Sequence, residues 1–461
     1  MLVALFALLA GEAVATPIYA ARSARTCDNC HVTPKEWDNP PLAERKCNMS
    51  CQSCHVDPAG GGMRNASGRY FGRSTLSMIA TSPRPTNDWD RNVSFVGRRD
   101  RATTYNDDLP LGPKTFEEAA AFADAVNDGW AWGTPLGAPT RYGLLAGRYG
   151  TLNPDPVFRV GTDVRFAALL SGSLAFPMQI DIPVVFHPVH HFTVLANTGA
   201  RGRPSGYSDT FDQDHSFYLR EAFAMVHEAP YQAYVKAGRF VPSFGLRLDD
   251  HTALIRRGFE LDGALPESRV SGVEVGAMPN YPFLNASWFR MAARQRVPDA
   301  WDITDVDDGW GSAINAGWRD LSWSVGASAL IRRRPIPEGG DTSSYGVYGV
   351  VNPWRRWRFV PLTYQFEYDY GSFQRSSGAE SQQAALYQEI QWVAANGVTL
   401  LAAHDWEDPD TEIVDDEAHR LQTGVQVSPI SGVTLDGRFR VLVPAVGSAD
   451  SDIFLQLHLW Q

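Results

Sequence analysis

The sequence has no run of 18 apolar residues, so no segment could cross a bilayer as a single helix. It also lacks an excess of positive charge: 41 Lys and Arg stand against 52 Asp and Glu, and 41 − 52 gives a formal charge of −11. That balance argues against a nucleic-acid binder, which needs a basic face. With 40 Gly and 30 Pro among 461 residues, the chain is neither collagen-like nor disordered. A β-barrel stays open, because barrel strands alternate and average to modest hydropathy.

The first residues have the pattern of a secretory signal. Leu2 to Ala10 is an apolar run too short to span a bilayer, and small residues follow it at Ala13 and Ala15. We expect residues 1–20 to be a signal peptide, cleaved after Ala15 or Ala20. The alternative is an N-terminal core helix.

Cysteine is scarce, and all five cysteines fall between residues 27 and 54. Four of them form two C-x-x-C pairs, each followed directly by a histidine. This spacing lets two thiols form thioethers to the haem vinyl groups, while the adjacent histidine supplies the proximal nitrogen to the iron. The sequence therefore predicts two haem c groups. The expected residues are Cys27, Cys30 and His31 for the first haem, and Cys51, Cys54 and His55 for the second.

Other interpretations of the cysteines compete with haem attachment. Twenty residues separate Cys30 from Cys51, so the four paired cysteines also match a zinc ribbon. Two disulfides and a thioredoxin-like redox site are further alternatives. Zinc does not require a histidine after each pair, and the βαβ context of a thioredoxin site is missing. Covalent haem is therefore favoured, and Cys47 is expected to be a free buried thiol, with haem ligation or pairing to another chain as alternatives.

The distal haem ligands are left open by the sequence. Histidine is absent between His55 and His187, so bis-histidine ligation would need a residue far along the chain, such as His187, His190 or His191. Methionine is the local alternative and raises the reduction potential relative to histidine. The local candidates are Met49, Met63 and Met78.

From Val157 onward the hydropathy pattern has a period of two. In 433–441, for example, the odd positions are apolar or glycine and the even positions are polar. Most such segments have the length of a tilted membrane strand. Sixteen are predicted, at 157–171, 174–186, 190–199, 216–227, 231–241, 268–278, 282–295, 309–318, 321–333, 343–352, 356–372, 382–395, 397–408, 418–428, 432–444 and 452–460.

The connections between these segments alternate in length. Links after even-numbered segments are short, as at 396–397, whereas most links after odd-numbered segments are long, as at 242–267. Short turns on one side, longer loops on the other and an even strand number are typical of an outer-membrane barrel. We therefore expect an all-β fold, an antiparallel outer-membrane β-barrel of about 16 strands with a small N-terminal c-type haem segment.

The chain then divides into four parts. Residues 1–20 are the signal peptide, and 21–100 are the dihaem cytochrome segment. Residues 101–155 form a connecting region with a short helix, and 156–461 form the transmembrane barrel. Both ends of the barrel, and hence the haem segment, are expected on the periplasmic side, with the haem segment in the periplasm or as a plug inside the barrel lumen.

At this point the chain resembles a family, the outer-membrane cytochrome–porin fusions best known from iron-oxidising bacteria. The C-x-x-C-H motifs at 27–31 and 51–55 carry the resemblance, and Ala237–Gly245 is similar to the G-R/Q-F-x-x-P-F-G pattern of phosphate-selective porins. Iron-oxidising members carry one haem, whereas this chain has two motifs. The resemblance implies electron transfer across the outer membrane.

The predicted function is thus electron transfer across the bacterial outer membrane through haem c held by a porin-like barrel. The expected partners are a periplasmic redox protein, an extracellular electron donor or acceptor such as iron, and the outer membrane itself, but no nucleic acid. An electron carrier is expected rather than a dedicated enzyme, since a dihaem peroxidase would need a mostly helical chain. The alternative is a solute-selective porin with a haem-bearing plug or sensor, in which basic residues favour anions unless nearby acids balance them: Lys236, Arg239, Arg247, Arg256 and Arg257.

Overall fold

The computed structural model describes residues 158–460 with short gaps, together with three pieces nearer the N-terminus at 55–60, 62–64 and 77–79, of which the first lacks residue 59. The gaps are at 172–173, 190–191, 201–216, 230–232, 249, 251, 260, 262–267, 279–280, 293–305, 320–322, 335–339, 353–361, 375–378, 396 and 431. Predictions that concern other residues, including the signal peptide and the first C-x-x-C-H motif, lie outside the described part. Among the residues described, no helix has the length and apolarity needed to cross a membrane.

The described chain is built almost entirely of β-strands. The strands are β1 Phe158–Val160, β2 Asp163–Leu169, β3 Leu174–Val189, β4 Phe192–Ala200, β5 Phe217–Ala229, β6 Ala233–Phe240, β7 Val270–Ala277, β8 Pro282–Ala292, β9 Val306–Arg319, β10 Trp323–Arg333, β11 Thr342–Val351, β12 Leu362–Gln374, β13 Glu380–Ala395, β14 Val398–Asp408, β15 Ala418–Val427, β16 Val433–Pro444 and β17 Asp450–Trp460. One short helix, α8 Leu254–Gly258, lies between β6 and β7.

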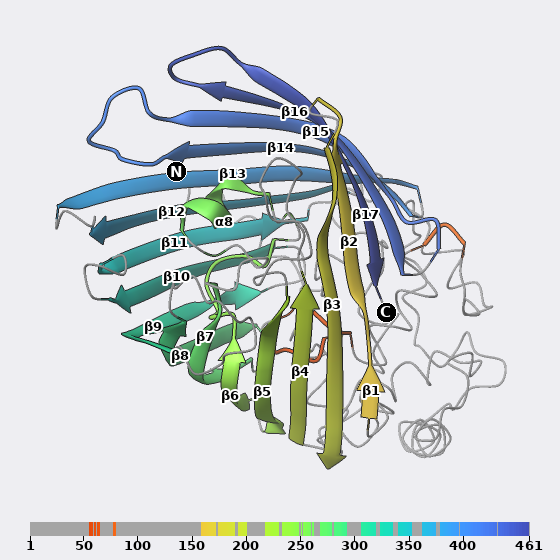
Figure 1. Ribbon diagram of the computed structural model, residues 1–461, viewed down its shortest axis with the longest axis vertical. Coiled ribbons are helices and arrows are strands. Elements are labelled where there is room, and N and C mark those ends of the chain that lie inside the picture. The colour runs from red at the N-terminus through yellow and green to blue at the C-terminus, as the bar shows by residue number, and fades with distance from the viewer. Residues whose placement is uncertain are drawn as a thin grey trace.

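The strands close into a ring (Figure 1). From β2 to β17 each strand pairs antiparallel with the next, and β17 returns to β2 in the register Phe454↔Leu169 to Trp460↔Asp163. Short β1 pairs with β3 beside β2, so it is an extra strand outside the sixteen of the ring. The fold is therefore a closed antiparallel 16-strand barrel with one extra strand.

The two faces of the barrel have opposite chemistry. On β16, Asp436, Arg438 and Arg440 are buried and point inward, whereas Leu435 and Phe439 point outward and are 47% and 48% exposed. The same alternation holds around the ring. Buried charged side chains include Arg165, Asp181, Arg220, Lys236, Glu274, Glu367, Asp369, Glu389, Asp405 and Arg420, while exposed apolar ones include Phe166, Ile182, Val226, Val273, Trp288, Ile314, Val347, Ile390, Leu421, Val425 and Ile453. A polar interior with an apolar exterior is the arrangement of a barrel that faces lipid.

Fifteen of the sixteen predicted segments each correspond to one strand of the ring, which confirms the predicted fold class. The first, 157–171, is divided at Gly161 and Thr162 into β1, outside the ring, and β2. The largest differences at a strand start are in β2, which begins at Asp163 rather than at residue 157, and in β12, which begins at Leu362 rather than at residue 356. The start of β12 follows Pro361, which has no backbone N–H to donate to a ladder. The link before it, 352–361, is therefore longer than the sequence pattern indicated.

The links at one rim of the barrel differ in length from those at the other. One rim, called here the short-turn rim, has brief connections such as 190–191, 320–322 and 396–397, and it also holds the start of β2 and the end of β17. The opposite rim holds most of the longer links. The longest of these, residues 241–269, is called the inserted link because its helix α8 contacts the barrel wall at β13 and β14 (Figure 1).

The exposed apolar face generates a stability prediction. Replacing Phe439 with arginine should destabilise the folded barrel in lipid vesicles by about 2–4 kcal/mol, the usual cost of a basic residue near the bilayer midplane. The conservative variant Phe439→Leu should retain most of the stability. Urea unfolding in vesicles, followed by tryptophan fluorescence, measures the free energy of both variants. Equal stability of the two would show that this face does not contact lipid.

Candidate functional site

Residues 55–64, called here the lumen hairpin, begin with His55, the histidine of the second C-x-x-C-H motif. His55 forms an antiparallel bridge with Arg64, and the Val56 N–H donates to the Met63 carbonyl at 3.0 Å. The turn between them needs left-handed backbone at Gly60, with φ of 88°, and at Gly62, with φ of 58°. Glycine adopts these angles without steric cost, so the glycine-rich sequence here closes a tight turn.

A buried ion-pair cluster attaches the hairpin to the barrel wall. The Lys236 ammonium on β6 lies 3.2 Å from the Asp57 carboxylate and 2.9 Å from the Glu274 carboxylate on β7. Lys236 and Glu274 are both 0% exposed. The Tyr234 hydroxyl donates a further hydrogen bond to Glu274 at 2.8 Å. Because one ammonium faces two carboxylates out of contact with water, the hairpin is tied to this part of the wall.

The other end of the hairpin is attached several strands away. The Arg159 guanidinium on β1 donates to the Arg64 carbonyl. The Arg64 guanidinium itself lies 3.6 Å from the ring centroid of Trp460, at the end of β17. A guanidinium over an indole face is a favourable cation–π contact. The hairpin therefore reaches from β6 to the region where the barrel closes.

Apolar contacts fill the space between these two attachments. Val56 and Met63 are buried and belong to one hydrophobic cluster with inward-facing side chains of the wall. The wall residues of this cluster include Val185 on β3, Leu195 on β4, and Phe223 and Met225 on β5. The hairpin is thus packed as part of the lumen core rather than held by its charges alone.

A second described piece, residues 77–79, lies at the short-turn rim. The Met78 N–H donates to the Ser428 carbonyl at 2.9 Å, and the Ile79 N–H donates to the Pro429 carbonyl at 3.0 Å. Ile79 also forms a parallel bridge with Ile430. The segment after the second C-x-x-C-H motif therefore contacts both the lumen and the short-turn rim.

The predicted haem residues are only partly within the described chain. Cys27, Cys30, His31, Met49, Cys51 and Cys54 lie outside the described residues. His55 begins the lumen hairpin and is half-buried, and Met63 is buried in the lumen cluster. Met78 is 48% exposed at the rim. The structure therefore places His55 and Met63 in the same hairpin and Met78 at a different site, while the assignment of the distal ligand stays a prediction.

Of the second motif, only His55 lies within the described residues, so its fit to a haem rests on the chemistry of its donor set. The donor set is the right one, a histidine directly after two paired thiols. His55 is half-buried, and a Cβ added at Gly62 would meet no heavy atom within 4 Å. The described backbone therefore leaves space beside Gly62.

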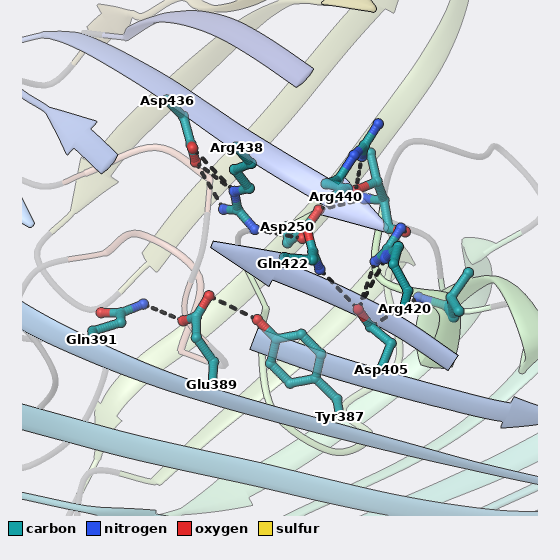
Figure 2. A network of polar contacts seen from close by, with 12 residues as sticks. Asp250, Tyr387, Glu389, Gln391, Asp405, Arg420, Gln422, Asp436, Arg438 and Arg440 are labelled. Carbon is teal, nitrogen blue, oxygen red and sulfur yellow. Dashed lines mark hydrogen bonds and ion pairs between the residues drawn. The ribbon is translucent and has the colours of Figure 1, made fainter. Parts of the chain in front are cut away.

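The inserted link is fixed to the opposite wall by a second polar network (Figure 2). The Arg438 guanidinium donates to the Asp250 carboxylate at 2.7 Å, and the Arg420 guanidinium donates to the Thr252 carbonyl at 2.7 Å. Arg420 is held in turn by Asp405 at 2.9 Å. Burial alone would raise the pKa of Asp250, but Arg438, Arg420 and the hydrogen bonds from Thr252 hold that pKa below its ordinary value. The carboxylate therefore stays charged, and the link is bound firmly to β14–β16.

A further attachment joins the link to β12. Arg256 on α8 forms an ion pair with Glu367, and the Leu246 N–H donates to the same carboxylate at 3.0 Å. Gly245 has φ of 58°, and a Cβ added there would clash with the Glu367 carboxylate. The porin-like pattern ending at Gly245 thus marks the point where the chain leaves β6 and turns into the lumen.

These contacts also concern the basic patch, the five basic residues that the sequence offered as favouring anions. Lys236 is paired with two acids, and Arg256 is paired with Glu367. Arg247 is exposed, and the side chain of Arg257 is not described. Two members of the patch are therefore charge-balanced, which is the alternative that the sequence left open.

Among the described residues, no group of three or more His, Cys, Asp or Glu side chains is arranged to hold a metal ion. Asp405, near the acidic link 409–417, faces the lumen and forms an ion pair with Arg420.

No family model matches the chain, and no curated protein matches it. Solved structures similar to it in fold include a loop-deletion mutant of OmpT of Vibrio cholerae, with a TM-score of 0.48 and 10% identity over 66% of this chain and 99% of that one. An anion-selective porin from Comamonas acidovorans gives 0.46 and 10% over 66% and 98%. Salmonella typhi OmpF in complex with daunomycin gives 0.47 and 11% over 66% and 97%. The architecture described above stands on this chain's own strand pairing.

Sequence reasoning did not identify the residues that tie the hairpin to the wall. Asp57 and Lys236 are far apart in sequence, and a lone lysine in a barrel strand normally faces a solvated lumen. The alternation along β6 was the signal that could have identified Lys236. It places Lys236 on the inward face of the strand together with Tyr234 and Phe240. That face holds two large aromatic residues beside the lysine, which indicates a packed rather than an open lumen.

The stability of the barrel wall and the attachment of the hairpin should both depend on Lys236. Lys236→Met should destabilise the barrel by about 3–5 kcal/mol, because the buried Glu274 would lose its countercharge. Asp57→Asn leaves the Lys236–Glu274 pair intact, so it should lower stability less while exposing the hairpin to limited proteolysis. Val235→Met, on the outward face of the same strand, serves as the control. A Lys236→Met barrel as stable as the control would contradict the buried-pair assignment.

Proposed function

We propose that this protein conducts electrons across the bacterial outer membrane, with haem c held by its N-terminal segment inside a porin-like barrel. The outer membrane is the bilayer in which barrels of this architecture reside, and the predicted signal peptide supports export to it. The apolar exterior of the strands supports contact with lipid. The short-turn rim would then face the periplasm.

One observation carries the proposal: the hairpin that follows the second C-x-x-C-H motif is packed inside the lumen. His55, the predicted proximal ligand, begins that hairpin, and Asp57, two residues later, is bound to Lys236. A hydrocarbon layer of about 30 Å is an insulator, so electron passage requires redox centres within a protein sheath. A haem attached at this motif would be carried into that sheath.

The residues of this chain have distinct roles in such a conduit. Cys51, Cys54 and His55 would hold the second haem, and Cys27, Cys30 and His31 would hold the first. When bound, haem c supplies reversible one-electron chemistry at its iron. Lys236, Glu274 and Arg159 fix the segment in place, while Val56 and Met63 exclude water from its contact with the wall.

The partners follow from the two rims. The electron donor or acceptor on the short-turn side would be a periplasmic redox protein. The other would be extracellular, with soluble or mineral iron as the candidate class from the sequence resemblance. Each transfer moves one electron from a reduced donor to an oxidised acceptor.

The second candidate is a solute-selective porin with a haem-bearing plug. The observation that favours it is the closed barrel itself. Two features count against it as the main role. The lumen hairpin is packed against β3–β6, and the inserted link is fixed to β12–β16, so chain enters the lumen from both sides. In addition, Lys236 and Arg256 are neutralised by acids. An obstructed lumen with balanced charge suits electron passage better than solute flux.

Reconstitution in liposomes tests the proposal. The purified protein is inserted into vesicles that contain a membrane-impermeant oxidised dye, and an impermeant reductant is added outside. We expect the dye to be reduced only when the protein carries haem. Pyridine haemochrome analysis of the same sample should give two haems per chain.

The matched control replaces all four paired cysteines with alanine, so that the barrel inserts without covalent haem. That variant should leave the dye oxidised. Rapid swelling of wild-type vesicles in small sugars, combined with no haem-dependent dye reduction, would favour the porin and refute the conduit.

A further inference from the structure

We propose that the outer face of β8–β10 binds the phosphate of an anionic lipid headgroup through Arg290 and Arg333, at the rim opposite the short-turn rim. This inference rests on the barrel and not on the haem, so its test is separate from that of the proposed function. It assigns a ligand to the side of the wall that contacts the membrane.

The first observation is a row of two arginines with a tryptophan between them. Arg290 on β8 is paired with Trp310 on β9, and Trp310 is paired with Arg333 on β10, three strands that follow one another around the wall (Figure 1). All three side chains are exposed, Trp310 by 48%, and lie on the outward face. Two strand spacings, about 10 Å, separate the backbones of the two arginines. Both guanidinium groups can therefore approach one ligand in front of Trp310.

The row lies at the edge of the membrane-facing surface. Arg290 is two residues from the end of β8 at Ala292, and Arg333 is the last residue of β10. Basic residues on the lipid face of a barrel are costly at the bilayer midplane but cost little near the interfaces. Tryptophan is also enriched at the level of the headgroups, where its ring meets both apolar and polar surroundings. The position of the row therefore fits a headgroup.

The second observation is an excess of positive charge in this row. Among the residues that the structure describes, none forms a hydrogen bond or ion pair with Arg290. Arg333 donates through Nη1 to the Asp341 carboxylate at 2.7 Å, and the Arg334 N–H donates to the same carboxylate at 3.2 Å. Asp341 thus orients the Arg333 guanidinium and occupies only part of its five donors. Two guanidinium groups and one carboxylate leave a positive charge that complements an anionic headgroup.

Guanidinium chemistry favours a phosphate as the group that is bound. A planar guanidinium matches the oxygen atoms of a phosphate with two parallel, charge-assisted hydrogen bonds. Arginine also extends its apolar stem along a membrane surface while its charged end stays at the polar level. Arg290 is therefore free to reach a phosphate that Arg333 also contacts.

The third observation is the apolar surface directly beside the row. One step farther into the membrane, Trp288 on β8 is 69% exposed and is paired with Ser312 on β9, which is paired in turn with Ile331 on β10. The next outward residue of β9, Ile314, is 45% exposed. Acyl chains attached to the bound phosphate would lie against these side chains. A lipid therefore uses both parts of the surface, whereas free phosphate would use the arginines alone.

Native mass spectrometry of the delipidated protein in a neutral detergent tests the proposal. We expect phosphatidylglycerol to bind more tightly than phosphatidylcholine, whose choline group carries a positive charge beside the phosphate. Arg290→Gln should weaken phosphatidylglycerol binding about fivefold, the usual effect of one basic residue near an anionic membrane surface. Arg290→Gln/Arg333→Gln should weaken it further, because Asp341 then faces the headgroup without a countercharge. Arg247→Gln, which removes the same charge from the inserted link, is the matched control and should bind phosphatidylglycerol as the unmodified protein does.

Three results would overturn the inference. Equal affinity of the unmodified protein for the two lipids would exclude recognition of an anionic headgroup, and this comparison needs no variant. Displacement of phosphatidylglycerol by millimolar inorganic phosphate would assign the arginines to a free anion instead of a lipid. Unchanged phosphatidylglycerol binding in the double variant, with the barrel folded by circular dichroism, would exclude the two arginines. None of these results depends on haem content, so failure here leaves the electron conduit untouched.

Discussion

The structure depends on the closure of the sheet between β17 and β2. An open sheet leaves a row of backbone N–H and C=O groups at each edge, and hydrocarbon offers them no partner. The register from Phe454↔Leu169 to Trp460↔Asp163 removes both edges. Closure then fixes which residues face inward, because strand side chains alternate. The outward set is free to be apolar, and the inward set can carry the charges that the hairpin and the inserted link bind.

Closure also decides what the interior can do. Sixteen strands enclose a lumen that their own side chains do not fill. Here two other parts of the chain are attached to the inner face of the wall, the lumen hairpin beside β3–β6 and the inserted link beside β12–β16. Each is held by a buried ion pair to the wall, Asp57 with Lys236 and Arg256 with Glu367. Charges that would be solvated in an open pore are instead neutralised within the protein.

The fold could be predicted from the sequence, because a period of two and the sorting of link lengths are both local signals. The run 433–441 alone shows which side chains of β16 face lipid. The contacts of the site could not be predicted, because they join residues far apart in the chain. Asp57 and Lys236 carry no shared local pattern, and neither do Arg64 and Trp460. His187 and Thr193 likewise come together only through the pairing of β3 with β4.

An electron pathway and a solute pathway place opposite demands on a lumen. Solute flux requires open, hydrated space, whereas electron transfer requires centres held at fixed separations and shielded from water. The buried triad of Asp57, Lys236 and Glu274 is a poor feature for a pore, since it holds a chain segment against β6 and neutralises the lysine. It is a suitable feature for a conduit, because a group attached near His55 is then fixed relative to the wall. Rigidity of the hairpin, rather than width of the barrel, is therefore the property that would govern the activity of this protein.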